Sequence, residues 1–292
     1  MILFFVLLTL SALQASDFLS MFTAQVSPDI HHLCLSILPT TSFHPLQSLL
    51  CGAPVQQPEL KQLLRSTGLL HLFVVSGAHL IWLEHWLCRL HAPFFLRVLG
   101  WTFFSLACGW QPPVVRGWIG LLLMKMEPRW TPSLRADQHV LLTGLITLIF
   151  FPLWGNSLSL ALSWVAAFSL SLSFPKGWKG ELMKCAAVWF FLLPLLAPWS
   201  PASPSTIFVN FLLAPVFSLF LLPLGIVCVL LPPVLPLFDF LFSCFVRILA
   251  LLPISSPEAT GRAPTSWGLW GWVILFHTLT HFVSTSKRRR AS

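Results

Sequence analysis

A serine and a histidine lie three residues apart in an apolar stretch of this sequence, at Ser76 and His79. On a helix this spacing brings both side chains to one face, where a histidine can activate a serine nucleophile. The pair therefore permits a serine hydrolase. Glu84 is the only nearby acid, however, and Gly68 and Gly77 allow a helix to break or to pack closely against a neighbour. We favour this packing or pore-lining interpretation and expect no enzyme activity.

The histidines do not form a convincing metal site. His71 and His79 are eight residues apart, so on a continuous helix they differ by about 80° around the axis and by about two turns along it. That separation is too large for both to bind one metal ion directly. The adjacent His31 and His32 have no third ligand at a suitable spacing. We therefore expect no metal and no cofactor.

Two of the seven cysteines, Cys34 and Cys51, lie together outside the long apolar runs. A disulfide bond between them is allowed if this region faces an oxidising compartment such as the periplasm. The other five cysteines sit in or next to apolar runs, where a cysteine is most simply a small buried side chain.

Two further polar residues interrupt later apolar segments. Arg116 follows Pro112-Pro113 at the end of a predicted span, where a guanidinium is costly unless it reaches headgroups, pairs with an acid or faces water. It is either a side chain that reaches the headgroups or a cation at the mouth of an aqueous path for anions. Asn210 precedes Pro215 by five residues, and its amide either bonds a neighbouring helix or a carbonyl freed at a kink, or holds a broken helix open along such a path.

The elements that carry these residues are membrane segments. Of the 292 residues, 56% are hydrophobic and 9% are charged, which excludes an ordinary soluble domain. The lengths of the uncharged stretches predict an all-α polytopic integral membrane protein with about seven to nine membrane segments. Many of the 24 prolines lie at the edges of apolar runs, so some helices should be broken or kinked. The tract 205–236 in particular predicts a kinked pair, and 238–252 either an interfacial helix or a short span.

The basic residues set the expected orientation, because cytoplasmic loops are enriched in lysine and arginine. Residues 1–16 resemble a signal peptide or a first membrane helix, and residues 17–60 form a short extracytoplasmic segment. The membrane domain covers residues 61–286, and its segment 68–88 runs inward. Residues 287–292 form a basic cytoplasmic tail. This assignment places every basic cluster that follows residue 88 on the cytoplasmic side of the inner membrane.

Several segments together resemble one known family, the ComEC-type competence proteins. The stretch from Leu63 to Leu83, LLRSTGLLHLFVVSGAHLIWL, is similar to the family signature, with Gly77-Ala78-His79 in place of Gly-Leu-His. Four shorter motifs occur in the family's order, and they are Ser48-Leu-Leu-Cys-Gly52, Pro112-Pro113-Val-Val-Arg116, the segment Leu158 to Leu170 with Ala161 in place of Gln, and Asn210 followed by Pro215 and Pro223.

The resemblance implies an inner-membrane channel that admits single-stranded DNA to the cytoplasm during natural transformation. His71, Ser76, Gly77, His79, Arg116 and Asn210 would then line or gate the channel. Lys61 and Arg65 would meet DNA at the outer surface. The expected partners are single-stranded DNA, membrane lipids, and a separate DNA receptor, nuclease and cytoplasmic motor, with oligomers allowed. The family's OB-like and metallo-β-lactamase-like domains have no counterpart in this sequence, so we expect a shortened form without nuclease activity.

Two other functions remain open from the residues alone. The same membrane core would suit a transporter for a small solute or a lipid precursor. The less favoured alternative is an intramembrane hydrolase that uses Ser76. Uptake of labelled DNA distinguishes the channel from the transporter, and substitution of Ser76 by alanine distinguishes the hydrolase from a packing role.

Overall fold

The protein is all-helical throughout the part of the chain that the structure describes. A computed structural model describes residues 21–38, 45–130, 134–197, 203–252, 268 and 270–278, and these ranges contain helices, turns and loops but no strand. The predicted leader, residues 1–16, and the basic tail, residues 287–292, lie outside the described residues.

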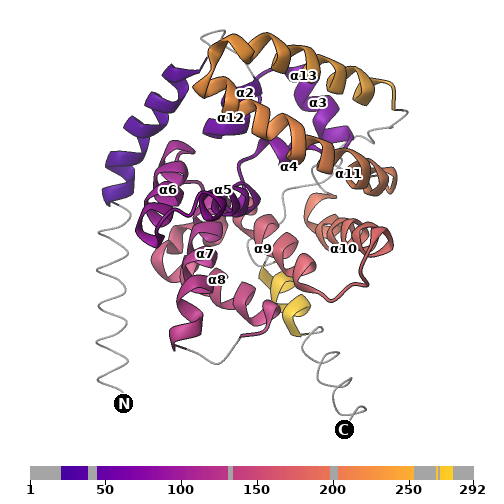
Figure 1. Cartoon of the computed structure of the whole chain (residues 1–292). Coiled ribbons are helices and arrows are strands. Elements are labelled where there is room, and N and C mark those ends of the chain that lie inside the picture. Colours follow the sequence, from indigo (N-terminus) through magenta and orange to yellow (C-terminus); the bar gives the residue numbers. More distant parts are fainter. Residues whose placement is uncertain are drawn as a thin grey trace, which may run out of the picture.

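The helices follow one another with short connections (Figure 1). In chain order they are residues 21–37, α2 (Pro45–Cys51), α3 (Pro58–Ser66), α4 (Leu70–Phe73), α5 (Gly77–Arg89), α6 (Phe94–Ala107), α7 (Pro112–Trp130), α8 (Ala136–Phe150), α9 (Leu158–Ser171), α10 (Trp178–Leu196), α11 (Ser205–Val216), α12 (Leu222–Leu230), α13 (Leu235–Ala250) and residues 270–278.

Helices α5, α6 and α7 form one packed unit in the middle of the molecule. Trp101 of α6 is fully buried between its neighbours, in a cluster with Leu80 of α5 and Val114 of α7. The indole N–H of Trp118 donates a hydrogen bond to the Thr102 hydroxyl at 3.0 Å and so ties α7 to α6. The first two helices of this unit are only 13 and 14 residues long, and their mutual packing, rather than their length, defines their place in the fold.

The second unit consists of α8, α9, α10 and the helix at residues 270–278. Trp164 of α9 packs against the backbone of α8, where a Cβ atom on Gly144 would lie 2.4 Å from its ring. Its indole N–H donates to His277 Nε2 at 3.0 Å. Glycine at position 144 is therefore required by the indole that covers it, and Trp164 connects three helices.

A third unit joins the beginning and the end of the described chain. Leu46, Leu64 and Phe73 from α2, α3 and α4 share one hydrophobic core with Phe217 and Phe238, which lie far later in the sequence. Figure 1 shows α2, α3, α12 and α13 together at the top of the molecule. The signature segment, residues 63–83, thus runs from this unit into the α5–α6–α7 unit.

The structure breaks the predicted inward segment 68–88. Helix α4 ends at Phe73, the residues around Val74 and Ser76 are extended, and α5 begins at Gly77. The sequence allowed either a break or close helix packing at its glycines, and the structure shows a break at Ser76 and Gly77. Because α5 has 13 residues, it is about 20 Å long and shorter than a hydrocarbon core of about 30 Å.

The proline-rich tract 205–236, for which the sequence predicts a kinked pair, forms one distorted helix followed by a short turn. Residues 205–230 run as a continuous helix of 26 residues that contains a π-helical turn at Phe217–Leu221. Pro215 and Pro223 flank this turn, and because proline has no N–H group the regular hydrogen-bond ladder cannot pass through them. A short 3₁₀ turn at Pro232–Val234 then separates this helix from α13.

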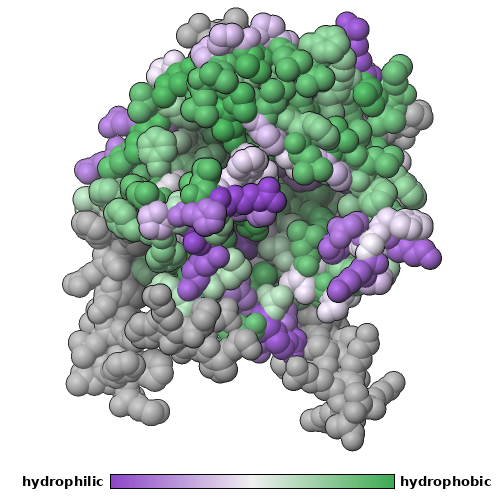
Figure 2. All heavy atoms as spheres, viewed as in Figure 1, coloured by the Kyte–Doolittle hydropathy of each residue, from purple (hydrophilic) through white to green (hydrophobic). Residues whose placement is uncertain are grey.

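The described surface is rich in exposed hydrophobic side chains. Phe240, Leu219 and Leu230 are between 64% and 74% exposed. Figure 2 shows hydrophobic residues covering most of the upper part of one face, with hydrophilic residues gathered near the middle and at the right. By length and hydropathy, two helices in the described ranges, Ser205–Leu230 and Pro232–Ala250, are able to cross a membrane. The full count of seven to nine segments stays a prediction.

Candidate functional site

The break before α5 is held by the two polar residues of the signature. Ser76 caps the helix, since its hydroxyl accepts a hydrogen bond from the Ala78 N–H at 3.3 Å, and its own N–H donates to His79 Nδ1 at 3.2 Å. This reciprocal arrangement is a capping box with histidine in the position usually taken by glutamate or glutamine. The Ser76 Oγ and His79 Nδ1 atoms are 3.4 Å apart. Both side chains are therefore used to start α5.

His79 also presents a buried polar atom without a partner. Its side chain is 7% exposed, and among the described residues its Nε2 atom has no hydrogen-bond partner. Because Nδ1 accepts the Ser76 N–H, the neutral ring carries its proton on Nε2. A buried donor without an acceptor is costly, so this N–H is available to an acceptor that reaches the break.

Two glycines bring α5 and α7 into backbone contact at the same level. A Cβ atom on Gly117 would lie 2.5 Å from the Gly77 Cα, and one on Gly77 would lie 3.2 Å from the Gly117 Cα. No other residue type fits at position 117 without separation of the two helices. The contact places Arg116, in the second turn of α7, directly beside the first turn of α5.

Arg116 is the most unusual charge in the described structure. Its side chain is buried, with 8% of its surface exposed, and its Nε donates to the Ser163 hydroxyl of α9 at 3.0 Å. No carboxylate pairs with it among the described residues. One terminal nitrogen lies 4.0 Å from the position that a Cβ on Gly77 would occupy. A guanidinium therefore faces the N-terminus of α5, whose backbone N–H groups also carry partial positive charge.

The Arg116 guanidinium and the N-terminus of α5 both attract anions. A buried charge without a counter-ion is unfavourable, and a helix N-terminus favours anions. An anionic group between Arg116 and the start of α5 would relieve the repulsion between them. The anion could be a phosphate or a carboxylate, and the Ser76 hydroxyl and the His79 Nδ1 are engaged in the cap beside it.

The other predicted residues gather at the α4 end of the break. His71 Nδ1 lies 2.8 Å from the Gly68 carbonyl oxygen. The His71 side chain is exposed. Gly68 has φ +73° and lies against α11, where a Cβ would be 3.3 Å from Asn210 Nδ2. Asn210 itself donates to the Thr206 carbonyl at 2.8 Å, one turn earlier.

The structure thus brings the predicted residues to two neighbouring places. Gly68, His71 and Asn210 lie before the break, and Ser76, Gly77, His79 and Arg116 lie after it. Lys61 and Arg65 are both exposed on α3, one helical turn apart, and no ion pair within the described ranges involves either. No cluster of three metal-ligating side chains occurs among the described residues.

Sequence reasoning missed three residues of this region. Ser163 was hidden inside an apolar run, and Gly117 appeared as an ordinary helix glycine. Glu84 was considered only as a partner of Ser76 and His79, but it lies at the far end of α5. There its buried carboxylate accepts hydrogen bonds from Arg97 and pairs with Lys125 Nζ at 3.0 Å. Arg97 lies near the start of a helix that follows a basic loop, and this position was the sequence signal that could have indicated a partner for Glu84.

The allowed disulfide is present. Cys34 and Cys51 are joined with a Cα–Cα distance of 5.9 Å, which links the helix at residues 21–37 to α2. His31 on the same helix contacts the end of α6, with Nδ1 2.8 Å from the Ala107 carbonyl oxygen. We call this end of the molecule, which also contains the loop 52–57, the disulfide end.

Comparison with known proteins agrees with the motifs. The family model described as "Competence protein" matches residues 55–288, well over half of the chain. An uncharacterized protein of Aquifex aeolicus (strain VF5) is 28% identical over 219 residues, which cover 68% of this chain and 51% of that protein. The chain therefore spans about half the length of this curated relative. No solved structure matches the chain. The matched range includes both sides of the break, and the chain belongs to the competence protein family.

Proposed function

We propose that this bundle is the channel through which single-stranded DNA crosses the cytoplasmic membrane during natural transformation. The observation that carries the proposal is the buried Arg116, which has no carboxylate partner in the described structure and faces the N-terminus of α5. Single-stranded DNA carries one phosphate per nucleotide, and a low-dielectric passage admits such a chain only if positive groups replace the lost hydration.

The arrangement favours passage over tight binding. One guanidinium together with one helix N-terminus provides a single binding position for a phosphate, whereas many cations in a row would bind the strand too tightly for it to move. The His79 Nε2–H and the exposed His71 side chain are further polar groups along the break. In this proposal each phosphate pauses at Arg116 and moves on when the next one arrives.

The membrane setting belongs to the same proposal. We place the disulfide end outside and the Glu84 end of α5 toward the cytoplasm, with the protein spanning the inner membrane several times. This orientation puts Lys61 and Arg65 where DNA first arrives. The bundle acts as a pore rather than an enzyme, and Ser76 and His79 serve to cap α5. A separate receptor, a nuclease and a cytoplasmic motor would deliver, trim and pull the strand.

The decisive experiment measures DNA uptake in a transformable strain that carries single substitutions. Arg116→Ala should lower transformation by more than about tenfold, because a hydrogen bond to a charged group contributes about 1.5–3 kcal/mol. Asn210→Leu should also lower transformation, because it removes the amide that lies against Gly68 and bonds the Thr206 carbonyl. Arg116→Lys should retain part of the activity. Ser76→Ala should transform nearly normally if Ser76 is a cap and should abolish function if it is a nucleophile.

The control is Lys184→Ala, which removes an exposed cation of α10 that pairs with Glu181. Its transformation frequency should equal that of the parent. All variants must reach parental amounts in the membrane fraction. If a strain without the protein takes labelled DNA into the cytoplasm at the parental rate, the channel function is wrong, and transport of a small solute or lipid precursor becomes the better hypothesis.

A further inference from the structure

We propose that a cavity at the disulfide end of the break binds one nucleotide unit of the incoming strand, with the base inside the cavity and the phosphate at Lys61. This inference rests on the proposed function and names the ligand contact that precedes Arg116. The cavity is lined by the loop Gly52–Val55 together with Lys61, Leu70, Phe73, Val74 and Gln111.

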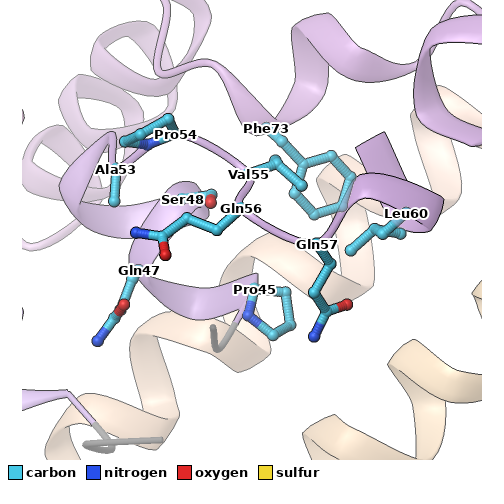
Figure 3. Close-up of a pocket in the computed structure, with 10 residues that line it drawn as sticks. All are labelled: Pro45, Gln47, Ser48, Ala53, Pro54, Val55, Gln56, Gln57, Leu60 and Phe73. Atoms are coloured by element: carbon cyan, nitrogen blue, oxygen red, sulfur yellow. The ribbon is translucent and has the colours of Figure 1, made fainter. Parts of the chain in front are cut away.

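Size distinguishes this cavity from its neighbour. The neighbouring hollow shares part of the loop 52–57 with it, is also lined by Pro45, Ser48 and Leu60 (Figure 3), and has a volume of about 10 Å³. That volume is at most enough for one water molecule. The cavity beside Lys61 has a volume of about 230 Å³, which admits a planar organic group.

The walls of the cavity are fixed before any ligand arrives. The loop wall is anchored by the Cys34–Cys51 disulfide, and the Gln111 side chain donates to the Gly52 carbonyl at 3.0 Å. On the opposite wall Phe73 is buried and makes edge contacts with Phe217, with ring centroids 5.0 Å apart. A preformed cavity loses little conformational entropy when a ligand enters.

The chemistry of the lining suits a group that is apolar and anionic at once. Pro54, Val55, Leu70 and Val74 provide apolar surface, and the Val74 side chain is 40% exposed. Lys61 is the one charged residue of the lining, and Arg65 adds a second exposed cation on the same face of α3. A nucleotide has this combination, because its base has an apolar face and its phosphate is negative. Such contacts do not depend on sequence, as uptake of arbitrary DNA requires.

Continuity with the break favours a DNA strand over an anionic lipid. Val74 lines the cavity and is two residues before Ser76, the cap of α5, beside which Arg116 lies. A strand with one nucleotide in the cavity could therefore extend along the break toward the next cation. A lipid headgroup would also satisfy Lys61, so lipid competition is one of the outcomes that the experiment must resolve.

The test measures binding of fluorescent ten-nucleotide strands to the purified full chain in lipid nanodiscs. One strand is oligothymidylate and the other is an abasic deoxyribose-phosphate strand of equal charge. The parent should bind thymidylate at least about fivefold more tightly, as expected for contact with one base. Val74→Trp should fill the cavity and remove this preference while leaving the abasic strand unaffected. Val74→Met should give an intermediate preference.

Two variants separate the base contact from charge and from general effects. Lys61→Gln should weaken both strands alike and reduce the salt dependence by about 0.7 in slope, the value for one phosphate on a single strand. Ile81→Trp, the same kind of enlargement at a position of α5 that is 61% exposed and outside the cavity, should retain the full preference. Thermal melting of each variant verifies folding.

Several outcomes would overturn the inference. Retention of the thymidylate preference in a folded Val74→Trp protein would show that the base lies elsewhere. Loss of the preference in phosphatidylglycerol nanodiscs, with retention in phosphatidylcholine ones, would assign the cavity to lipid. If the preference is absent but Arg116→Ala still blocks uptake, the cavity proposal fails and the channel stands. If Arg116→Ala and Asn210→Leu transform normally, the channel assignment itself fails.

Discussion

At the scale of single residues, α5 contacts two buried charges, of which one has counter-charges and the other has none among the described residues. At the C-terminal end the Glu84 carboxylate, 6% exposed, is shared by Arg97 and Lys125. At the N-terminal end Arg116 has one neutral hydrogen-bond partner, Ser163, and no acid within the described chain. A compensated cluster of this kind is expected to stabilise the packing of three helices, whereas an uncompensated cation is expected to serve a ligand.

Glu84→Gln should therefore destabilise the protein strongly. The change leaves Arg97 and Lys125 without a counter-charge in a buried position, and loss of one partner of a buried ion pair costs about 3–5 kcal/mol. We expect a lower thermal unfolding midpoint and less protein in the membrane fraction.

The matched control for this change is Glu181→Gln. Glu181 pairs with Lys184 on α10, but its side chain is 60% exposed. Exposed pairs contribute about 0–1 kcal/mol, so the midpoint should hardly move. Equal effects of the two substitutions would contradict the structural role assigned to Glu84.

At the scale of helices, the α5–α7 contact is the element that creates the site. The two helices run in the same direction, since Gly77 meets Gly117 near their starts and Glu84 meets Lys125 further along. Their glycines allow the backbones to touch, and this contact sets the distance between Arg116 and the first turn of α5. We therefore expect the distance between α5 and α7 to affect DNA uptake as well as stability.

Gly117→Ala should separate α5 from α7. The added methyl group would lie 2.5 Å from the Gly77 Cα, which a backbone atom cannot avoid without a helix shift. Overpacking of this kind costs about 1–3 kcal/mol, and we expect transformation to fall along with the thermal unfolding midpoint.

Gly155→Ala is the appropriate control for this substitution. An added Cβ at position 155 would meet nothing within 4 Å, so stability and uptake should remain at parental values. A parental phenotype for Gly117→Ala as well would mean that the spacing of α5 and α7 does not matter for function.

At the scale of the whole molecule, the early and late parts of the chain are held together around the break. Leu46 and Leu64 pack with Phe217 and Phe238 in the largest buried cluster of the described residues. The disulfide adds a covalent link between the helix at residues 21–37 and α2 within this region. The cavity wall therefore depends on segments that are distant in sequence.

Replacement of both Cys34 and Cys51 by serine should lower the stability of the disulfide end. A closed loop with a sequence separation of 17 residues corresponds to about 3 kcal/mol in the chain-entropy account. We expect a lower unfolding midpoint for the double variant and no further effect of a reducing agent on it.

The same measurement with Cys244→Ser provides the control, because Cys244 is a free cysteine of α13. This variant should keep the parental midpoint and should still lose stability on reduction. A double Cys34/Cys51 variant that unfolds at the parental temperature would show that packing alone holds the loop 52–57.

The sequence by itself determined the helical class, a helical distortion in the proline-rich tract after residue 204 and the identity of the polar residues at the break. These features depend on local patterns of hydropathy, glycine and proline, which act over a few turns of helix. The tertiary structure decided that segment 68–88 is not one helix and that Gly117, Ser163 and Glu84 belong with the predicted residues. It also showed that the loop 52–57 forms a cavity wall beside Lys61. These pairings join residues up to about 50 positions apart, and no local pattern specifies them, because only the packing of α7 against α5 and α9 determines which buried charge finds a partner.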